Sequence, residues 1–215
     1  MFPLSTIDSG NKICHKNSEK TTFNVIIGLT ASVACIKTKE LVQEINTLFS
    51  DNKILVNLKL VPTNNALFFI SHEELLKLAP TIIDNEEWLS WSQKGDPVLH
   101  IELRKWADAF LIAPLDANTM AKLSYGLCDN LLTCVARAWD FKNPIFVAPA
   151  MNTFMWDHPH TKKHLDILNE LNINIINPVA KKLACGDYGV GAMASPKDIA
   201  QTVFNYLLGR ESTLN

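Results

Sequence analysis

Short apolar runs alternate with longer amphipathic stretches along most of the chain. Strand-like runs occupy residues 25–27, 54–61, 110–113, 145–148 and 173–176, and a glycine or proline follows each run closely. Runs of this kind are typical of strands buried on both faces of a sheet. Between them, apolar residues recur at helical spacing, which predicts helices over 32–49, 64–78, 98–106, 117–125, 130–139, 152–171 and 196–208.

This alternation of strands and helices predicts an α/β fold, an open parallel sheet with helices on both faces. Residues 84–95 and 180–195 interrupt the pattern and are expected to be an irregular excursion and a glycine-rich loop. We expect a flexible leader over residues 1–22, one domain over 23–209 and a tail over 210–215. Ligands of such sheets bind at the carboxyl ends of the strands, so the residues after each strand carry most information about function.

Composition excludes several classes of protein. The chain has 215 residues, of which 47% are hydrophobic and 20% charged, with a net charge of -2. These values are ordinary for a globular domain and argue against a nucleic-acid binder with a basic face. No apolar run approaches the ~18 residues that span a bilayer, and the leader lacks the apolar core of a signal peptide. The five cysteines have no paired spacing. A reducing compartment, the cytoplasm, is therefore expected.

Small and polar side chains gather where three of the strands end. Residues 28–33, 116–119 and 149–153 each lead from a strand into a helix start. Free N–H groups and the helix dipole attract anions there, and methionine and tryptophan nearby add apolar surface. Together these segments predict one ligand with a phosphate and an apolar body. The first loop alone is typical of a plain turn capped by Ser32, since it has neither the dinucleotide nor the P-loop glycine pattern.

Glycine is scarce in this chain but concentrated in one loop. Of the 8 glycines, Gly186, Gly189 and Gly191 lie within residues 183–193, together with Cys185. Glycines at such spacing allow positive φ and close backbone approach, which suits a flap over a site. A cysteine in such a flap is a natural proton donor or redox partner. The alternative is a long connector with turn glycines.

The histidines give weaker indications. From spacing alone, His100 among apolar neighbours is typical of a structural histidine. His158, His160 and His164 surround a proline on a polar segment without a matching carboxylate or thiol. We therefore predict no metal site.

Five segments taken together carry a resemblance to a known family. They are residues 96–103, 113–119, 126–132, 149–156 and 183–189, in this order, within a similarity that spans about 23–208. In this combination the chain resembles the homo-oligomeric flavin-containing cysteine decarboxylases, and most closely their eukaryotic phosphopantothenoylcysteine decarboxylase branch, with its plant and yeast halotolerance relatives. The resemblance implies a flavodoxin-like, Rossmann-like sheet, bound FMN, and a homotrimer with active sites between subunits.

The resemblance also implies a reaction, the decarboxylation of 4'-phosphopantothenoylcysteine to 4'-phosphopantetheine within coenzyme A synthesis. The substrate carboxylate has no electron sink of its own. In this family the flavin oxidises the cysteinyl thiol to a thioaldehyde, which accepts the electrons released with CO2, and the resulting enethiolate is then reduced again. No external electron acceptor is required.

Residue by residue, the resemblance assigns roles within this chain. His100 matches the active-site histidine and Cys185 the flap cysteine that donates a proton. The implied substrate contacts are Asn152, which binds the carboxylate, Met155, Ala184 and Gly186. The implied flavin contacts are Gly28, Thr30, Ala31, Ser32, Val33, Asn65, Asp116, Ala117, Asn118, Thr119, Ala150 and Met151. Asp116 stands where relatives often carry serine, and we expect its carboxylate to point away from the flavin phosphate or to cap the following helix.

Other functions remain as alternatives. Some yeast relatives regulate a protein phosphatase. Here His100, Asn152 and Cys185 are all present and the long acidic tail of those regulators is absent, which favours a self-sufficient enzyme. A decarboxylase of peptides that end in cysteine and a flavin prenyltransferase share the fold. The close match around His100 and Cys185 favours the phosphopantothenoyl substrate.

Overall fold

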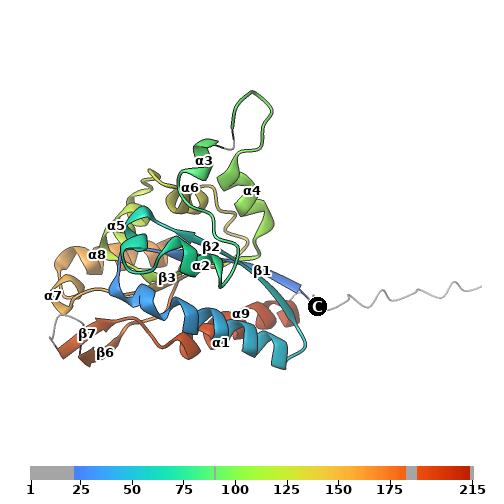
Figure 1. Cartoon of the computed structure of the whole chain (residues 1–215). Coiled ribbons are helices and arrows are strands. Elements are labelled where there is room, and N and C mark those ends of the chain that lie inside the picture. The colour runs from blue at the N-terminus through green and yellow to red at the C-terminus, as the bar shows by residue number, and fades with distance from the viewer. Residues whose placement is uncertain (1–21, 90, 183–187, 214–215) are drawn as a thin grey trace, which may run out of the picture.

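Five parallel strands form the central sheet (Figure 1). The structure is a computed structural model that describes residues 22–89, 91–182 and 188–213. The strand order is β2-β1-β3-β4-β5, which is the flavodoxin-like order with its switch point between β1 and β3. The predicted fold class is confirmed. The strands are β1 (Thr22–Leu29), β2 (Leu55–Pro62), β3 (Ala109–Leu115), β4 (Ile145–Pro149) and β5 (Asn174–Ile175).

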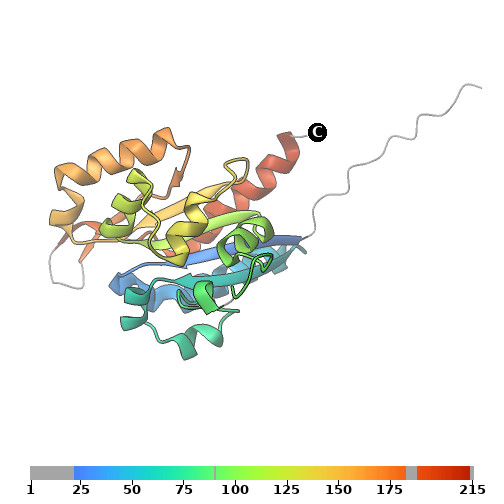
Figure 2. The ribbon, with the colours of Figure 1, turned by 90° about the horizontal axis from the view of Figure 1, so that it is seen from above.

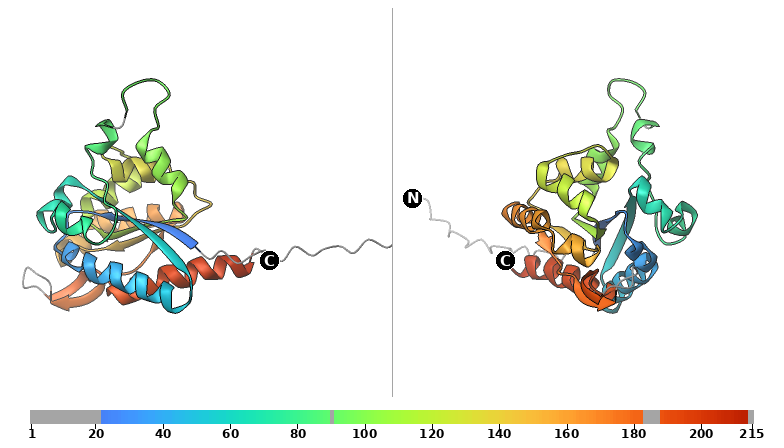
Figure 3. Two further views of the ribbon diagram at one scale, coloured as in Figure 1. Left: turned by 45° about the vertical axis from the view of Figure 1, so that its right-hand side comes forward. Right: turned by 90° about the vertical axis from the view of Figure 1, so that its left-hand side faces the viewer.

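Each face of the sheet carries its own apolar core. On one face, Val25 and Ile27 pack with the helices α1 (Thr38–Asp51) and α9 (Pro196–Thr213). On the other face, Ile26 and its neighbours pack with four helices (Figure 3). These helices are α4 (Leu99–Trp106), α5 (Ala117–Tyr125), α6 (Leu131–Arg137) and α8 (Pro159–Glu170). Because strand side chains alternate between faces, the continuous apolar run over residues 25–27 of β1 is what a doubly covered strand requires.

The helix predicted over residues 64–78 is wrong, because two short helices replace it. They are η2 (Asn64–Phe68) and α2 (His72–Leu76), and Ser71 begins the second. The Ser71 hydroxyl accepts from the Glu74 backbone N–H at 3.2 Å, and the Glu74 carboxylate accepts from the Ser71 N–H at 2.9 Å. This capping box is a start signal inside a continuous periodic stretch. Figure 2 shows α2 (teal) at the β2 edge of the sheet and α8 (orange) at the β5 edge.

Proline divides the helix expected over residues 152–171. The structure has α7 (Thr153–Trp156) and then α8, with Pro159 as its first residue. Proline lacks the N–H that a helix interior needs, but the first turn has no partner for that group. The first predicted helix also begins differently, since a 3₁₀ turn, η1 (Val33–Lys37), precedes α1.

The residue that caps helix α6 is Asn130. The Asn130 side chain accepts from the Thr133 N–H at 2.9 Å. Asp129 instead pairs with the Lys122 ammonium at 2.7 Å, which holds the pKa of the Asp129 carboxyl below its usual range. Asn130 thus begins α6, and Asp129 connects this helix start to α5 through Lys122.

Both interruptions of the pattern contain regular structure. The excursion holds the short helix α3 (Glu86–Leu89). The glycine-rich segment contains two antiparallel strands, β6 (Val179–Lys182) and β7 (Tyr188–Ala192), so its description as a loop is wrong for these residues. The last helix extends to Thr213, past Gly209. Among the described residues, none of the helices has the length and apolarity needed to cross a membrane.

Candidate active site

One pocket of about 520 Å³ lies at the carboxyl ends of the central strands. Its volume is within the roughly 300–1,000 Å³ of small-molecule sites. Segments that follow β1, β3 and β4 line it together with residues of β6 and β7 and those just after them. The lining residues are Ala31, Ser32, Val33, Ala34, Ile36, Lys37, Phe69, Asp116, Ala117, Asn118, Ala150, Met151, Asn152, Met155, Lys181, Gly191, Ala192 and Met193. The predicted convergence of the three strand ends on one site is thus present in the structure.

A buried threonine fixes the first two loops against each other. The Thr30 hydroxyl donates to the Pro114 carbonyl at 2.9 Å and accepts from the Asp116 N–H at 2.7 Å. Thr30 itself is fully buried. Because the hydroxyl bonds both ways within the protein, its role here is to hold the floor of the pocket.

The thiol of Cys35 supports the same floor. Its sulfur donates to the Thr30 carbonyl at 3.1 Å, and burial raises the pKa of this thiol to about 11. At neutral pH the group is therefore a neutral thiol. Ser32 begins η1 above it, with its hydroxyl accepting from the Ala34 N–H at 3.3 Å.

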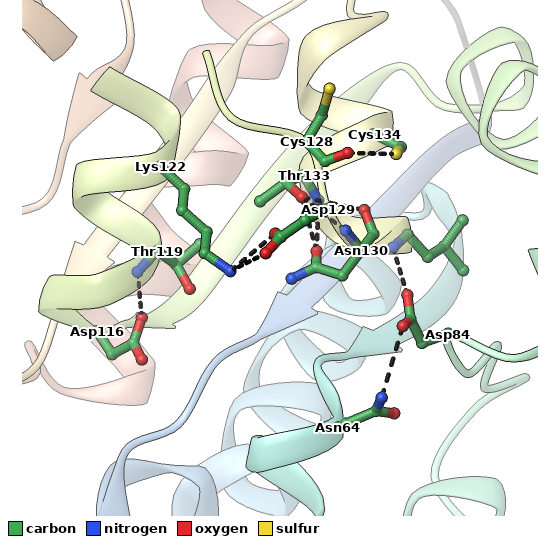
Figure 4. A network of polar contacts seen from close by, with 11 residues as sticks. Asn64, Asp84, Asp116, Thr119, Lys122, Cys128, Asp129, Asn130, Thr133 and Cys134 are labelled. Carbon is green, nitrogen blue, oxygen red and sulfur yellow. Dashed lines mark hydrogen bonds and ion pairs between the residues drawn. The ribbon is translucent and has the colours of Figure 1, made fainter. Parts of the chain in front are cut away.

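The carboxylate of Asp116 caps helix α5 (Figure 4). Its Oδ1 accepts from the Thr119 N–H at 2.7 Å. A carboxylate at this place satisfies a backbone donor and faces the positive end of the helix dipole. The cap is one of the two arrangements expected for this unusual acid, and it lets a negative side chain stand in the wall of an anion site.

The end of β4 joins the pocket to the hairpin. Asn152 caps α7, with its Oδ1 accepting from the Phe154 N–H at 2.8 Å. The Met151 N–H donates to the Gly191 carbonyl at 2.9 Å. Gly191 has φ +143°, and a Cβ there would clash with the Met151 carbonyl oxygen. Only glycine therefore lets β7 approach this wall so closely.

The predicted contacts divide into three groups. Those that line the pocket are Ala31, Ser32, Val33, Asp116, Ala117, Asn118, Ala150, Met151, Asn152 and Met155. Gly28, Thr30 and Thr119 are buried behind that lining and do not belong to it. Asn65 is exposed on η2 and does not line the pocket either. Ala184, Cys185 and Gly186 lie outside the described residues. The ligand contacts assigned to these residues stay predictions.

His100 lies elsewhere, in the first turn of α4. Its Nδ1 is 2.5 Å from Oε1 of Glu87 on α3. His100 is described but does not line the pocket. Figures 1 and 3 show α3 and α4 standing away from the β6–β7 hairpin. Within a single chain, the two halves of the predicted site are therefore not assembled.

Sequence reasoning missed several residues of the pocket wall. The most informative are Lys37, Lys181 and Phe69, since they bring two cations and an aromatic ring. Lys37 could have been found, because it follows the first loop by one helical turn. Phe69 could not, since it comes from the segment that had been taken as continuous helix.

These walls match a phosphate-bearing ligand with a flat apolar body. Ala31, Ala117 and Ala150 are small and leave room between the strand ends, and Met151 and Met193 supply apolar contact. Lys37 and Lys181 offer positive charge, and the η1 start offers N–H groups. A phosphorylated flavin has this combination of a ring system and an anion.

Comparison with known proteins supports the same conclusion. A family model described as Flavoprotein matches residues 13–208. Phosphopantothenoylcysteine decarboxylase of Oryza sativa subsp. japonica is 50% identical over 179 residues, which cover 83% of this chain and 78% of the relative. The mouse (Mus musculus) protein of the same name is 44% identical over 188 residues, covering 86% and 88%.

Solved structures agree with these sequences. A mutant PPC decarboxylase complexed with pantothenoylaminoethenethiol is 47% identical and has a TM-score of 0.80, covering 86% of this chain and 98% of that one. The FMN binding protein AtHal3 is 48% identical with a TM-score of 0.76, covering 86% and 96%.

The fold and the pocket define a flavodoxin-like flavoprotein. More particularly, the chain belongs to the phosphopantothenoylcysteine decarboxylase family. The family predicted from the sequence is confirmed, and with it the carboxy-lyase class and FMN as the cofactor.

Proposed function

We propose that this protein decarboxylates 4'-phosphopantothenoylcysteine to 4'-phosphopantetheine in coenzyme A synthesis. The observation that carries the proposal is the pocket itself. It places Asn152 and Met155, which the family resemblance assigns to the substrate, beside the loops assigned to the flavin. We expect the reaction to take place in the cytoplasm, the reducing compartment that the cysteines predict.

The cofactor fits the pocket through residues of three loops. Ala31, Ser32 and Val33 would hold FMN from the first loop, Asp116–Asn118 from the second, and Ala150 with Met151 from the third. FMN bound by these residues would supply reversible two-electron chemistry for the oxidation of the substrate thiol and the later return of the electrons. Most of the lining residues are apolar. Apolar walls limit the access of water to a site where the substrate carboxylate and thiol react.

Asn152 orients the substrate carboxylate in this mechanism. Its Oδ1 faces the α7 backbone, and the amide Nδ2 is a donor, the type of group that a carboxylate requires. Because Asn152 also starts α7, its side chain has one preferred orientation. When Asn152 holds the carboxylate in this way, the carbon–carbon bond that breaks to release CO2 keeps a fixed direction relative to the pocket. Cys185, outside the described residues, would return a proton to the enethiolate.

We propose further that the enzyme is a homotrimer with active sites between subunits. His100 lies away from the pocket of its own chain and would reach the pocket of a neighbour. Three large apolar side chains on η2 and α3 are almost fully solvent-exposed in the single chain: Phe68 at 86%, Trp88 at 79% and Leu89 at 83%. Such surfaces are typical of subunit contacts.

The test uses the protein loaded with FMN and two substrates in parallel. One is 4'-phosphopantothenoylcysteine and the other is a peptide that ends in cysteine, and mass spectrometry measures the loss of CO2 from each. We expect loss from the first and not from the second. Turnover of the peptide alone would instead make the chain a peptidyl-cysteine decarboxylase, and turnover of neither would favour the regulatory alternative.

A further inference from the structure

The carboxylate of Glu87 contacts two nitrogen atoms of His100, the ring Nδ1 and the backbone N. Its Oε1 is 2.5 Å from the ring Nδ1, and its Oε2 accepts from the His100 backbone N–H at 3.1 Å. The Glu87 side chain is only 10% exposed, and that of His100 is 25% exposed. The two residues come from different helices, so this pair fixes the ring of His100 relative to its own backbone.

The chemistry of the pair determines where the ring carries its proton. An ionised carboxylate is only an acceptor, so Nδ1 must be the donor in this contact. The neutral ring then has its lone pair on Nε2, and the protonated ring has its second proton there. In either state Nε2 is the ring nitrogen that remains for a reacting group.

We propose that Glu87 is the positioning residue of His100. It sets the tautomer and the ring orientation of His100 so that Nε2 can accept the proton of the substrate thiol. The inference rests on the proposed function of this site. Glu87 itself touches neither substrate nor flavin in this scheme and acts through His100. Its role is that of the carboxylates that orient the histidines of other enzymes.

The segment that carries Glu87 is anchored at several points. Glu86 accepts from the Ile83 N–H at 3.0 Å at the start of α3. Asp84 accepts from the Leu131 N–H at 2.5 Å and so ties the segment to the beginning of α6, and Asn64 donates to Asp84 at 3.5 Å (Figure 4). These contacts hold the segment before α3 against α6 and η2. The Glu87–His100 pair is thus formed by a segment that other hydrogen bonds hold in place.

Replacing Glu87 by glutamine tests the proposal because it changes the number of acceptors. A carboxylate accepts from both the ring and the backbone N–H, whereas an amide offers one acceptor and one donor. Glu87→Gln therefore leaves one of the two His100 donors facing an N–H group. Glu87→Asp keeps two acceptors on a shorter side chain. Glu86→Gln makes the same chemical change on the neighbouring residue of α3, where one oxygen is enough to accept from the Ile83 N–H and the amide still provides it.

The first readout is steady-state kinetics with 4'-phosphopantothenoylcysteine. We expect Glu87→Gln to lower kcat about 10- to 100-fold with a change in KM of less than about threefold, since orientation of a histidine acts on the transition state. Glu87→Asp should recover part of the loss, and Glu86→Gln should match the unmodified enzyme. If the unmodified enzyme and Glu86→Gln are both inactive, the proposed function fails and not this inference. If both are active and Glu87→Gln is as fast as they are, the inference is overturned.

The second readout separates positioning from folding. NMR of protein labelled with ¹⁵N-histidine, with His100 assigned by comparison with His100→Asn, reports which ring nitrogen carries the proton. We expect Nδ1–H in the unmodified protein and a different tautomer population in Glu87→Gln. In the His100→Asn background, Glu87→Gln should cost no further activity. An unchanged tautomer, or a full additional loss in the double variant, would contradict the positioning role.

Discussion

At the scale of single residues, Asp116 shows how one side chain serves both stability and the site. It caps α5 through the Thr119 N–H and also stands in the pocket wall. From the sequence, two arrangements were expected for this acid beside a phosphate site: a carboxylate that points away from the phosphate or one that caps the following helix. The structure gives the physical reason that it is tolerated, since a helix start offsets its charge.

Two substitutions of Asp116 separate these roles. Asp116→Ala removes the cap and should destabilise the protein by about 1 kcal/mol, whereas Asp116→Ser keeps a good capping group and removes the charge. We expect Asp116→Ser to bind FMN at least as tightly as the unmodified protein, because less negative charge faces the phosphate. Thermal unfolding at one protein concentration and a titration of flavin fluorescence measure the two effects. Weaker FMN binding by Asp116→Ser would show that the carboxylate contributes a direct contact.

Residue-level prediction from the sequence worked where a side chain follows a strand and failed where it depends on distant partners. The segment with Asn152 and Met151 was predicted to lie at the site because Pro149 marks the end of β4, and the contacts of the two residues were implied by the family resemblance. The support role of Thr30 depends on Pro114 and Asp116, more than eighty residues away in sequence. Glu87 was missed for the same reason, since its partner lies on another helix and its own segment has no periodicity.

At the scale of elements, the hairpin and the β4 loop act as one wall. The strands β6 and β7 pair with each other, and Met151 joins them to the sheet through Gly191. Sequence patterns did not predict these strands, because β6 contains Lys181 and Lys182 and therefore is not an apolar run. The glycines were taken as hinges of a flap, and for Gly191 the structure adds a second requirement, the contact with the Met151 backbone.

This requirement makes a prediction about Gly191. Gly191→Ala forces a residue with a Cβ into φ +143° and against the Met151 carbonyl, so the wall must move. Strain of ~1–2 kcal/mol is expected, and FMN affinity should fall about tenfold. Gly209→Ala is the matched control, because a Cβ on Gly209 in α9 meets no atom within 4 Å. The control should raise stability by ~0.5–1 kcal/mol and leave FMN binding unchanged. Equal FMN affinity of the two variants would show that the pocket does not depend on this close approach.

At the scale of the whole molecule, the fold was predictable and the assembly of the site was not. The parallel sheet and its two helical layers follow from the alternation of apolar runs and helices, and the flavodoxin-like strand order followed from the family resemblance. Where His100 lies relative to the pocket does not follow from that pattern. The excursion over residues 84–95 carries α3 away from the sheet, and its exposed Trp88 and Leu89 are available for the subunit contact that we propose.

Mixed oligomers test whether the site is shared between subunits. We expect His100→Asn and Asn152→Asp each to be nearly inactive alone, because every site then lacks one of its two groups. If His100 of one subunit serves the pocket of its neighbour, co-expressed chains of both kinds form interfaces that contain intact His100 and intact Asn152. In a trimer that contains both kinds of chain, one of the three interfaces is of this kind, so about a third of full kcat should return after purification through both chains.

The measurement compares co-expressed chains, carrying two different affinity tags and purified through both, with the two variants purified separately and mixed without exchange. Phe68→Asp placed in both chains is expected to weaken the apolar contact and to lower the recovered activity together with the oligomer mass. Phe141→Ser is the control, since Phe141 is also an exposed aromatic, at 51%, but lies in the turn before β4. A site contained within one chain would give no recovery in any mixture, because each chain would still lack one group. Recovery that depends on Phe68 and not on Phe141 would therefore tie the chemistry of the pocket to the η2–α3 surface.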